Sequence, residues 1–157
     1  MQGAVKMKRA ILPAVLAIAM MTSVSAQARP DFTGTWKPDP ARSKTIGGLG
    51  PELTITVEGS KMTIIRTVAG NSASTVYLLD GTPSTNTIGV PGKQAEITYT
   101  SKWEGNVLVT TWSNPTITNV ERRSIQDDGT MKVEVTHNYN KEPGKSETST
   151  RVFNKAK

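Results

Sequence analysis

The feature that most constrains the fold of this chain is the alternation of apolar and polar residues over short stretches. Within 52–58, aliphatic residues at every second position alternate with glutamate and threonine, and Gly59-Ser60 then offers a two-residue turn into 61–68. Residues two apart in a β-strand share a face, so each stretch has one apolar side. If Glu58 pairs with Lys61, the apolar sides coincide and Leu53 lies opposite Arg66, which favours a hairpin in this register.

A second hairpin is predicted within 95–112, whose sequence is AEITYTSKWEGNVLVTTW. Tyr99 and Trp103 share one face of the first half, and a turn at Glu104-Gly105 pairs Trp103 with Asn106. This register brings Trp112 to the same face as Tyr99. Two strands that are independently patterned to the same side indicate a cross-strand pair.

A third hairpin is predicted from 116–126 and 131–139, joined by a turn over 127–130 that contains two aspartates and a glycine. Val133, Val135 and His137 share one face of the returning strand. In this register Arg122 lies opposite Val135, on the same inner face. A last strand over 146–154 follows another turn that contains proline and glycine.

Together with stretches near 32–37, 74–79 and 85–88, these patterns predict eight to ten short antiparallel strands. Turn signals recur about every ten residues, a spacing that is typical of all-β sandwiches and barrels. Consecutive hairpins without a long crossover favour an all-β, antiparallel up-and-down β-barrel, because closure of the sheet removes exposed edges. No linker or repeat divides the chain, so we expect one domain over 29–157.

The first 28 residues are predicted to be a signal peptide. Three basic residues at 6, 8 and 9 precede an apolar run over 10–24, and Ala26-Gln27-Ala28 supplies a small–x–small cleavage pattern. A run of about 15 apolar residues is too short for a typical membrane span. We therefore expect an exported protein, periplasmic or extracellular, that does not span the membrane once the signal is cleaved.

The charge and the cysteine content of the chain argue against several classes of function. The chain has a net charge of +6, and the predicted signal holds three of these positive charges and no acidic residue, so about +3 remains on the folded domain. A mildly basic domain gives no support to nucleic-acid binding. The absence of cysteine excludes disulfides, thiolate catalysis and cysteine metal sites.

The start of the predicted domain carries the pattern Phe32-x-Gly34-x-Trp36. It resembles the first strand of the lipocalin-like (calycin) barrels, small secreted bacterial members included. The resemblance implies that Trp36 closes one end of the barrel and packs under an arginine of the last strand, here Arg151, an arrangement worth about 1 kcal/mol as a cation–π contact. The central Thr-Asp-Tyr motif and the disulfides of many lipocalins are missing, and the biotin-contacting residues of avidins find no match.

Basic residues on the expected inner faces are the candidate ligand-binding groups. A buried arginine needs a partner, and the resemblance to calycin barrels such as the fatty-acid-binding proteins implies that interior arginines and a tyrosine hold a ligand carboxylate. The expected set is Arg66, Tyr99, Arg122, His137 and Tyr139. Two alternatives remain open: a β-bulge could turn either arginine outward, and the barrel could be filled by its own side chains.

No catalytic or metal-binding constellation is recognisable in the sequence. His137 is the single histidine, and on a face shared with valines we expect a structural, hydrogen-bonded role. A metal site would need further ligands at a matching spacing, so no metal or cofactor is expected. Three functions stay open: an exported barrel that binds a small, partly apolar and possibly anionic amphipathic ligand; a filled barrel that binds a protein or glycan through its surface; and an enzyme on a calycin scaffold with His137 as base.

Overall fold

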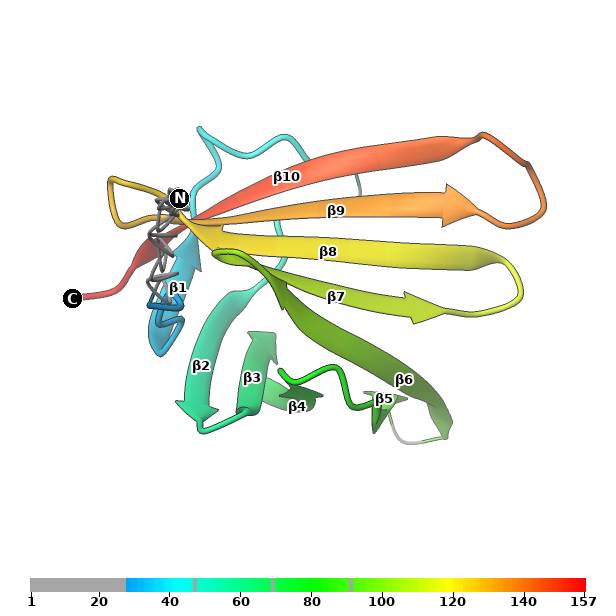
Figure 1. The fold of residues 1–157 in the computed structure, drawn as a ribbon, viewed down its shortest axis with the longest axis horizontal. Coiled ribbons are helices and arrows are strands. Elements are labelled where there is room, and N and C mark those ends of the chain that lie inside the picture. Colours follow the sequence, from blue (N-terminus) through cyan, green and yellow to red (C-terminus); the bar gives the residue numbers. More distant parts are fainter. Residues whose placement is uncertain (1–27, 47, 69, 91) are drawn as a thin grey trace, which may run out of the picture.

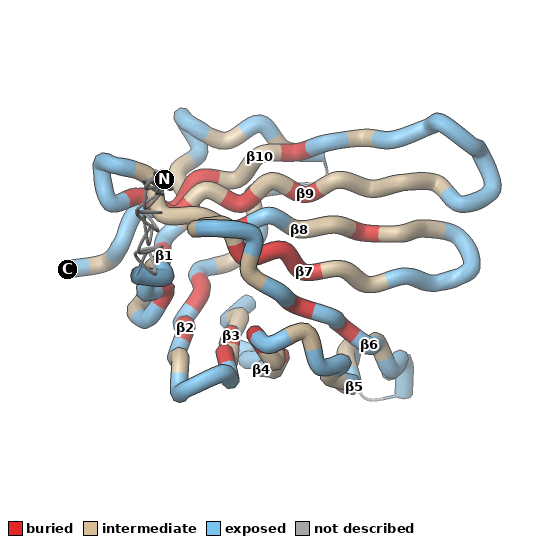
Figure 2. The backbone as a smooth tube through the Cα atoms, viewed as in Figure 1, coloured by how far each residue is buried: buried red, intermediate tan, exposed pale blue. Residues whose placement is uncertain are grey.

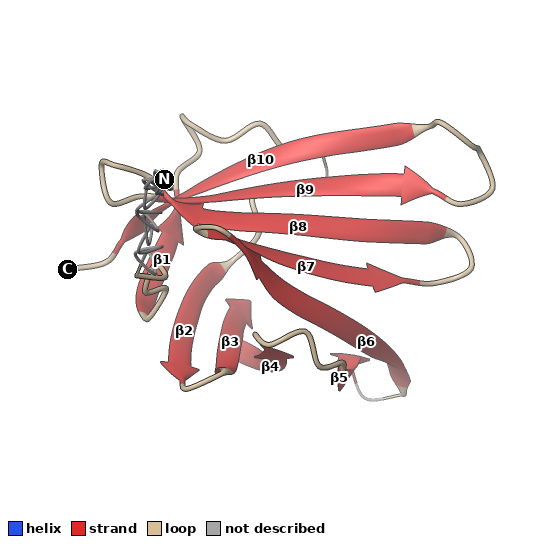
Figure 3. Ribbon diagram, viewed as in Figure 1, coloured by secondary structure: helices blue, strands red, loops and turns tan. Residues whose placement is uncertain are grey.

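The chain folds into an antiparallel all-β structure in which every described secondary-structure element is a strand (Figures 1 and 3). The computed structural model describes residues 28–46, 48–68, 70–90 and 92–157. The predicted signal peptide, 1–28, lies outside these residues apart from Ala28. The ten strands are β1 (Gly34–Pro38), β2 (Glu52–Glu58), β3 (Lys61–Val68), β4 (Asn71–Leu78), β5 (Ser84–Val90), β6 (Lys93–Glu104), β7 (Val107–Ser113), β8 (Ile117–Ile125), β9 (Met131–Tyr139) and β10 (Ser146–Lys155).

The strands form one sheet that curves into a nearly closed barrel. Their order is β4-β3-β2-β1-β10-β9-β8-β7-β6-β5, so strands that follow one another in sequence pair, except β4 and β5, and the first strand pairs with the last. In Figure 1, β2, β3 and β4 lie across from the long strands β7 to β10. This is the up-and-down topology that the alternating sequence predicts.

The opening of the barrel lies between β4 and β5, the two ends of the sheet. Two side chains of β5 bridge this seam. Asn86 accepts a hydrogen bond from the Val76 amide of β4 at 2.7 Å and donates one to the Val76 carbonyl at 2.8 Å. Ser84 Oγ donates to the same carbonyl at 2.8 Å. The carboxamide thus takes the place of a strand backbone, because it offers both an acceptor and a donor.

The core fills the space between the curved faces of the sheet, and buried residues recur at alternate positions along its strands (Figure 2). Phe32, Trp36, Ile55, Met62 and Ile64 are each at most 1% exposed. Buried and exposed positions alternate as the sequence pattern predicts, because successive side chains of a strand point in turn to the core and to solvent. The hairpin of β2 and β3 has the predicted register, with Glu58 opposite Lys61 and Leu53 opposite Arg66.

The hairpin of β6 and β7 has the predicted faces but a different turn. Trp103 pairs with Leu108 rather than with Asn106, and the turn residues are Gly105 and Asn106 instead of Glu104 and Gly105. Gly105 has a φ of +58°, a left-handed conformation that glycine adopts at little cost. The register differs from the prediction by two residues, and a shift of two leaves every side chain on its expected face.

Trp36 is 1% exposed, and its indole Nε1 donates to the Phe32 carbonyl at 2.8 Å. The cation over its ring is Lys155, the residue that pairs with it across β1 and β10, with Nζ 5.4 Å from the ring centre. The prediction that Arg151 stacks on Trp36 is therefore wrong, because Arg151 lies four residues earlier in β10 and pairs with Val133. Gly34 has a φ of +135°, and a Cβ there would lie 2.7 Å from Lys155 Cε.

The connection from β1 to β2 runs along β10. Lys44 exchanges backbone hydrogen bonds with Thr150 of that strand at 2.8 and 2.7 Å, and the end of the connection brings Leu49, Gly50 and Pro51 over the barrel interior. Across the described ranges of the chain, there is no helix with the length and apolar character needed to cross a membrane.

Candidate functional site

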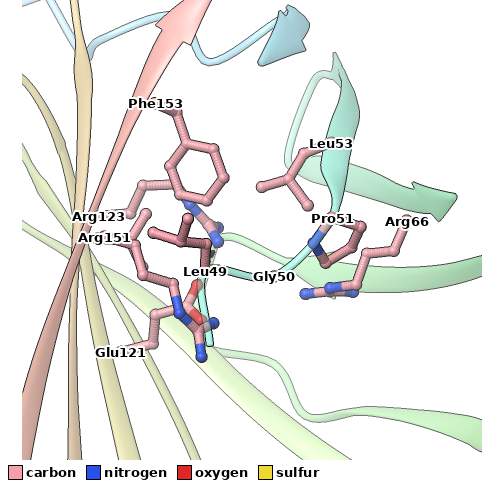
Figure 4. Close-up of a pocket in the computed structure, with 10 residues that line it drawn as sticks. Leu49, Gly50, Pro51, Leu53, Arg66, Glu121, Arg123, Arg151 and Phe153 are labelled. Carbon is pink, nitrogen blue, oxygen red and sulfur yellow. Dashed lines mark hydrogen bonds and ion pairs between the residues drawn. The ribbon is translucent and has the colours of Figure 1, made fainter. Parts of the chain in front are cut away.

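A small cavity inside the barrel gathers four charged side chains. Its volume is about 30 Å³, and Figure 4 shows the charged groups reaching it from opposite walls, Arg66 from β3 and the others from β8 and β10. Since one water needs about 10–15 Å³ on this scale, the cavity admits a group of a few atoms. The lining residues are Leu49, Gly50, Pro51, Leu53, Arg66, Glu121, Arg123, Val133, Arg151 and Phe153.

Arg66 lies on the inner face of β3, where the alternation of this strand places it. Its Nη1 donates to Thr75 Oγ1 at 3.0 Å and its Nη2 donates to the Tyr77 hydroxyl at 3.2 Å. Both acceptors are neutral groups of β4. Arg66 therefore has its orientation fixed by hydrogen bonds while its positive charge is not matched by either partner.

On β8 the inner arginine is Arg123, not Arg122. Arg122 pairs with Glu134 rather than with Val135, and its half-exposed guanidinium donates to Glu104 at 2.9 Å on the outside of the barrel. Arg123 pairs with Val133, and its side chain is 2% exposed. The prediction that Arg122 faces the interior is wrong.

The cause of this difference is the turn between β8 and β9. Ile125 pairs with Met131, which leaves a five-residue connection over 126–130 where four residues were expected. Asp128 Oδ1 accepts hydrogen bonds from the Thr130 amide at 3.0 Å and from the Thr130 hydroxyl at 2.6 Å, and Gly129 has a φ of +78°. One extra turn residue shifts the register by one, and such a shift exchanges the two faces of a strand.

Among the described residues, Arg123 has one ionic partner, Glu121, which lies two residues away on the same inner face. Its Nη2 donates to Glu121 Oε1. The buried Nε and Nη1 of Arg123 and the buried Nε of Arg151 have no hydrogen-bond partner among the described residues. Buried N–H groups are normally paired because an unpaired one costs about 1–3 kcal/mol, and more when it is charged. These N–H groups are therefore available to donate hydrogen bonds to an acceptor group of a ligand.

Tyr99 lies near the arginine cluster but does not line the cavity. Its ring packs edge-to-face on Tyr77, the hydroxyl acceptor of Arg66, with 5.1 Å between ring centres. Burial, followed by the neighbouring Tyr77, raises the pKa of Tyr99 to about 12. Tyr99 is thus a neutral phenol that contacts the tyrosine orienting Arg66.

His137 and Tyr139 lie further along the inner face of β9 and do not line this cavity. The Tyr139 hydroxyl donates to Glu147 at 2.8 Å, and Lys145 Nζ lies 4.8 Å from the centre of its ring. The buried Nδ1 of His137 has no partner in the described part of the chain, so the hydrogen-bonded role expected for it is not what the structure gives. The structure therefore brings Arg66, and not these two residues, to the cavity.

A second and more open cavity of about 390 Å³ lies at the N-terminal end of the domain, beside Trp103. Phe32 stacks on Trp103 with 5.8 Å between ring centres, and the Arg29 guanidinium lies 5.4 Å from the centre of the indole. These contacts pack the indole of Trp103 between Phe32 and Arg29. Within the described ranges, no group of three or more acidic or histidine side chains is arranged to hold a metal ion.

Sequence reasoning missed Glu121, Arg123 and the segment Leu49–Pro51. The alternation of β8 contains a usable signal, because Asn119, Glu121 and Arg123 share one face, but the sequence does not reveal how many residues the following turn takes. The segment 49–51 reaches the cavity only because the β1–β2 connection follows β10, and its residues carry no periodic pattern. These three parts of the site could not be predicted because their positions depend on the length of a turn and the path of a loop.

Comparison with solved structures identifies the architecture. The REP1-NXSQ fatty acid transporter superposes with a TM-score of 0.61 at 17% identity, covering 80% of this chain and 96% of the other. The fatty-acid-binding protein 1 of Echinococcus granulosus gives a TM-score of 0.61 at 17% identity, covering 80% and 98%. This chain has a calycin-like β-barrel fold. At this identity the likeness concerns the fold alone; no family model matches the sequence, and no curated protein matches it.

Proposed function

We propose that this protein is exported and binds a small, partly apolar, anionic ligand inside its barrel, without catalysis. The observation that carries the proposal is the buried guanidinium of Arg123, whose Nε and Nη1 find no partner among the described residues and lie beside an interior cavity. A ligand anion there would accept charge-assisted hydrogen bonds, which are about twice as strong as neutral ones. Two of the fold neighbours, a fatty acid transporter and a fatty-acid-binding protein, support the same class of ligand.

The apolar part of the ligand is assigned to one side of the cavity. Leu49, Leu53 and Phe153 line it beside the three arginines, so an amphipathic molecule could place its head group on the guanidiniums and its tail on these side chains. The cavity of about 30 Å³ holds only the head group. We expect the tail to leave past Leu49–Pro51, which would have to move outward.

Export rests on the basic, apolar and small-residue pattern of 1–28. The absence of catalysis is proposed because, among the described residues, no carboxylate or hydroxyl is hydrogen-bonded to the His137 ring, and its Nδ1 is unpartnered. A general base needs such a contact or a substrate proton within about 3 Å. Detection of the mature N-terminus after secretion would test the first point.

The small size of the cavity favours one competing function, a filled barrel that binds a protein or glycan through its surface. Titration of the mature protein with a fluorescent fatty acid separates the two. We expect saturable binding, weakened about tenfold or more by Arg123→Met, with Arg122→Gln as the matched control, because Arg122 faces solvent. Binding that is absent, or that both substitutions leave unchanged, would favour the filled barrel.

A further inference from the structure

The interior site holds more positive than negative charge. Three guanidiniums line it, those of Arg66, Arg123 and Arg151, and Glu121 is the single carboxylate among the lining residues. Arginine stays protonated at any pH at which the protein is folded. The site therefore carries a formal excess of two positive charges.

In the described ranges, the residues around the cavity do not supply the missing negative charge. The hydrogen bonds of Arg66 go to the neutral Thr75 and Tyr77. Glu147, the next acidic residue on the inner face of β10, accepts a hydrogen bond from Tyr139 and does not line the cavity. Because uncompensated buried charge is costly, the excess indicates what charge a fitting ligand should carry.

The number and direction of the unpaired N–H donors add a second constraint on the head group of the ligand. Arg66 enters from β3, while Arg123 and Arg151 enter from β8 and β10 on the opposite wall (Figure 4). Three buried nitrogens in this cluster, Nε and Nη1 of Arg123 and Nε of Arg151, have no acceptor within the part of the chain that the structure describes. A carboxylate has two oxygens and one charge, so it would leave one positive charge unmatched. A phosphate monoester has three terminal oxygens and a charge of about −1.5 to −2 near pH 7.

We propose that the cationic interior site selects a dianionic phosphate group, carried by an amphipathic phosphomonoester, over a monoanionic carboxylate. This inference rests on the proposed function, because it assumes that the ligand's head group enters the cavity. One terminal oxygen faces each guanidinium, and Glu121 keeps Arg123 oriented through Nη2 while its Nε and Nη1 remain free for the ligand.

Isothermal titration calorimetry of the mature protein with four probes tests this selectivity. Dodecyl phosphate supplies two charges, dodecyl methyl phosphate keeps the tetrahedral head with one charge, dodecanoate supplies a carboxylate, and inorganic phosphate has no tail. We expect dodecyl phosphate to bind at least about tenfold more tightly than either monoanion, a difference of about 1.4 kcal/mol. Arg66→Met removes one excess charge and should bring the three alkyl ligands to within a few-fold of one another, whereas Arg122→Gln should preserve the preference.

The outcomes separate this inference from the proposed function. Dodecanoate binding as tightly as dodecyl phosphate would overturn the inference and leave the proposed function standing. A lack of binding by all four probes would overturn both. Inorganic phosphate binding as tightly as dodecyl phosphate would support selection of a dianion and contradict the apolar part of the proposed function. If Arg66→Met does not fold, the comparison of the four probes on the unsubstituted protein still decides.

Discussion

Replacement of Glu121 by glutamine provides a sharp test of the interior charge arrangement. The carboxylate is 16% exposed and its partner Arg123 is 2% exposed, so the pair is largely removed from water. Removal of one partner from a buried ion pair typically costs 3–5 kcal/mol, because the other charge stays buried and unmatched. Since Glu121 keeps some exposure, we expect Glu121→Gln to lower the free energy of unfolding by about 3 kcal/mol.

Urea unfolding of the mature protein measures this effect. With a slope of about 1.5 kcal/mol per molar urea, a loss of about 3 kcal/mol moves the midpoint down by about 2 M. Glu104→Gln is the matched control, since it makes the same chemical change in the exposed pair with Arg122, and an exposed pair contributes about 0–1 kcal/mol.

The double substitution Glu121→Gln with Arg123→Met tests whether the unmatched buried charge of Arg123 causes this loss of stability. It removes both charges and leaves Arg66 and Arg151, so the site keeps the same excess charge as the unsubstituted protein. Replacement of a buried ion pair by neutral groups of similar volume is often neutral or stabilising, and we expect stability within about 1 kcal/mol of the original. Equal losses from Glu121→Gln and Glu104→Gln would refute the reasoning, because the interior pair would then behave as a solvated one.

Three further predictions concern the barrel itself. Trp36→Ala should cost about 4 kcal/mol in urea unfolding, because it opens a cavity where a side chain is 1% exposed; a loss below about 1 kcal/mol would show that the tryptophan does not close the barrel. Tyrosinate absorbance should show Tyr99 titrating near pH 12. The neutral phenol is favoured in the folded protein, so its contribution to stability is complete below pH 10 and is lost as the pH rises to about 12; a normal titration near pH 10 would contradict its burial. Asn86→Ala should cost about 1–2 kcal/mol and speed hydrogen exchange of the Val76 amide, whereas unchanged exchange would mean that the seam does not depend on this side chain.

Much of the fold follows from side-chain periodicity and short turns. The β2–β3 hairpin was predictable because Gly59-Ser60 makes the shortest connection and both strands have one apolar face. The β6–β7 hairpin kept its faces despite a register that differed by two residues. In both cases the apolar pattern decides which side faces the core, whatever the details of the turn.

The site was less predictable because it depends on the length of one turn. Arg122 and Arg123 are adjacent, so one of them had to face inward, and the choice follows from whether four or five residues connect β8 to β9. The hydrogen bonds of Asp128 to Thr130 belong to the five-residue form, and the sequence DDGT is compatible with either length. The partner of Trp36 was mistaken for a related reason, since the register of β1 against β10 brings Lys155 to its ring.

The measurement that tests the central claim most directly is native mass spectrometry of the mature protein, purified without detergent, before and after extraction with organic solvent. An interior ligand site predicts a reproducible extra mass that extraction removes and that an added amphipathic anion restores. Arg123→Met should reduce that retention, whereas Arg122→Gln should not. A bare protein mass in every sample, with no uptake from a panel of fatty acids and alkyl phosphates, would contradict the account and indicate a barrel filled by its own side chains.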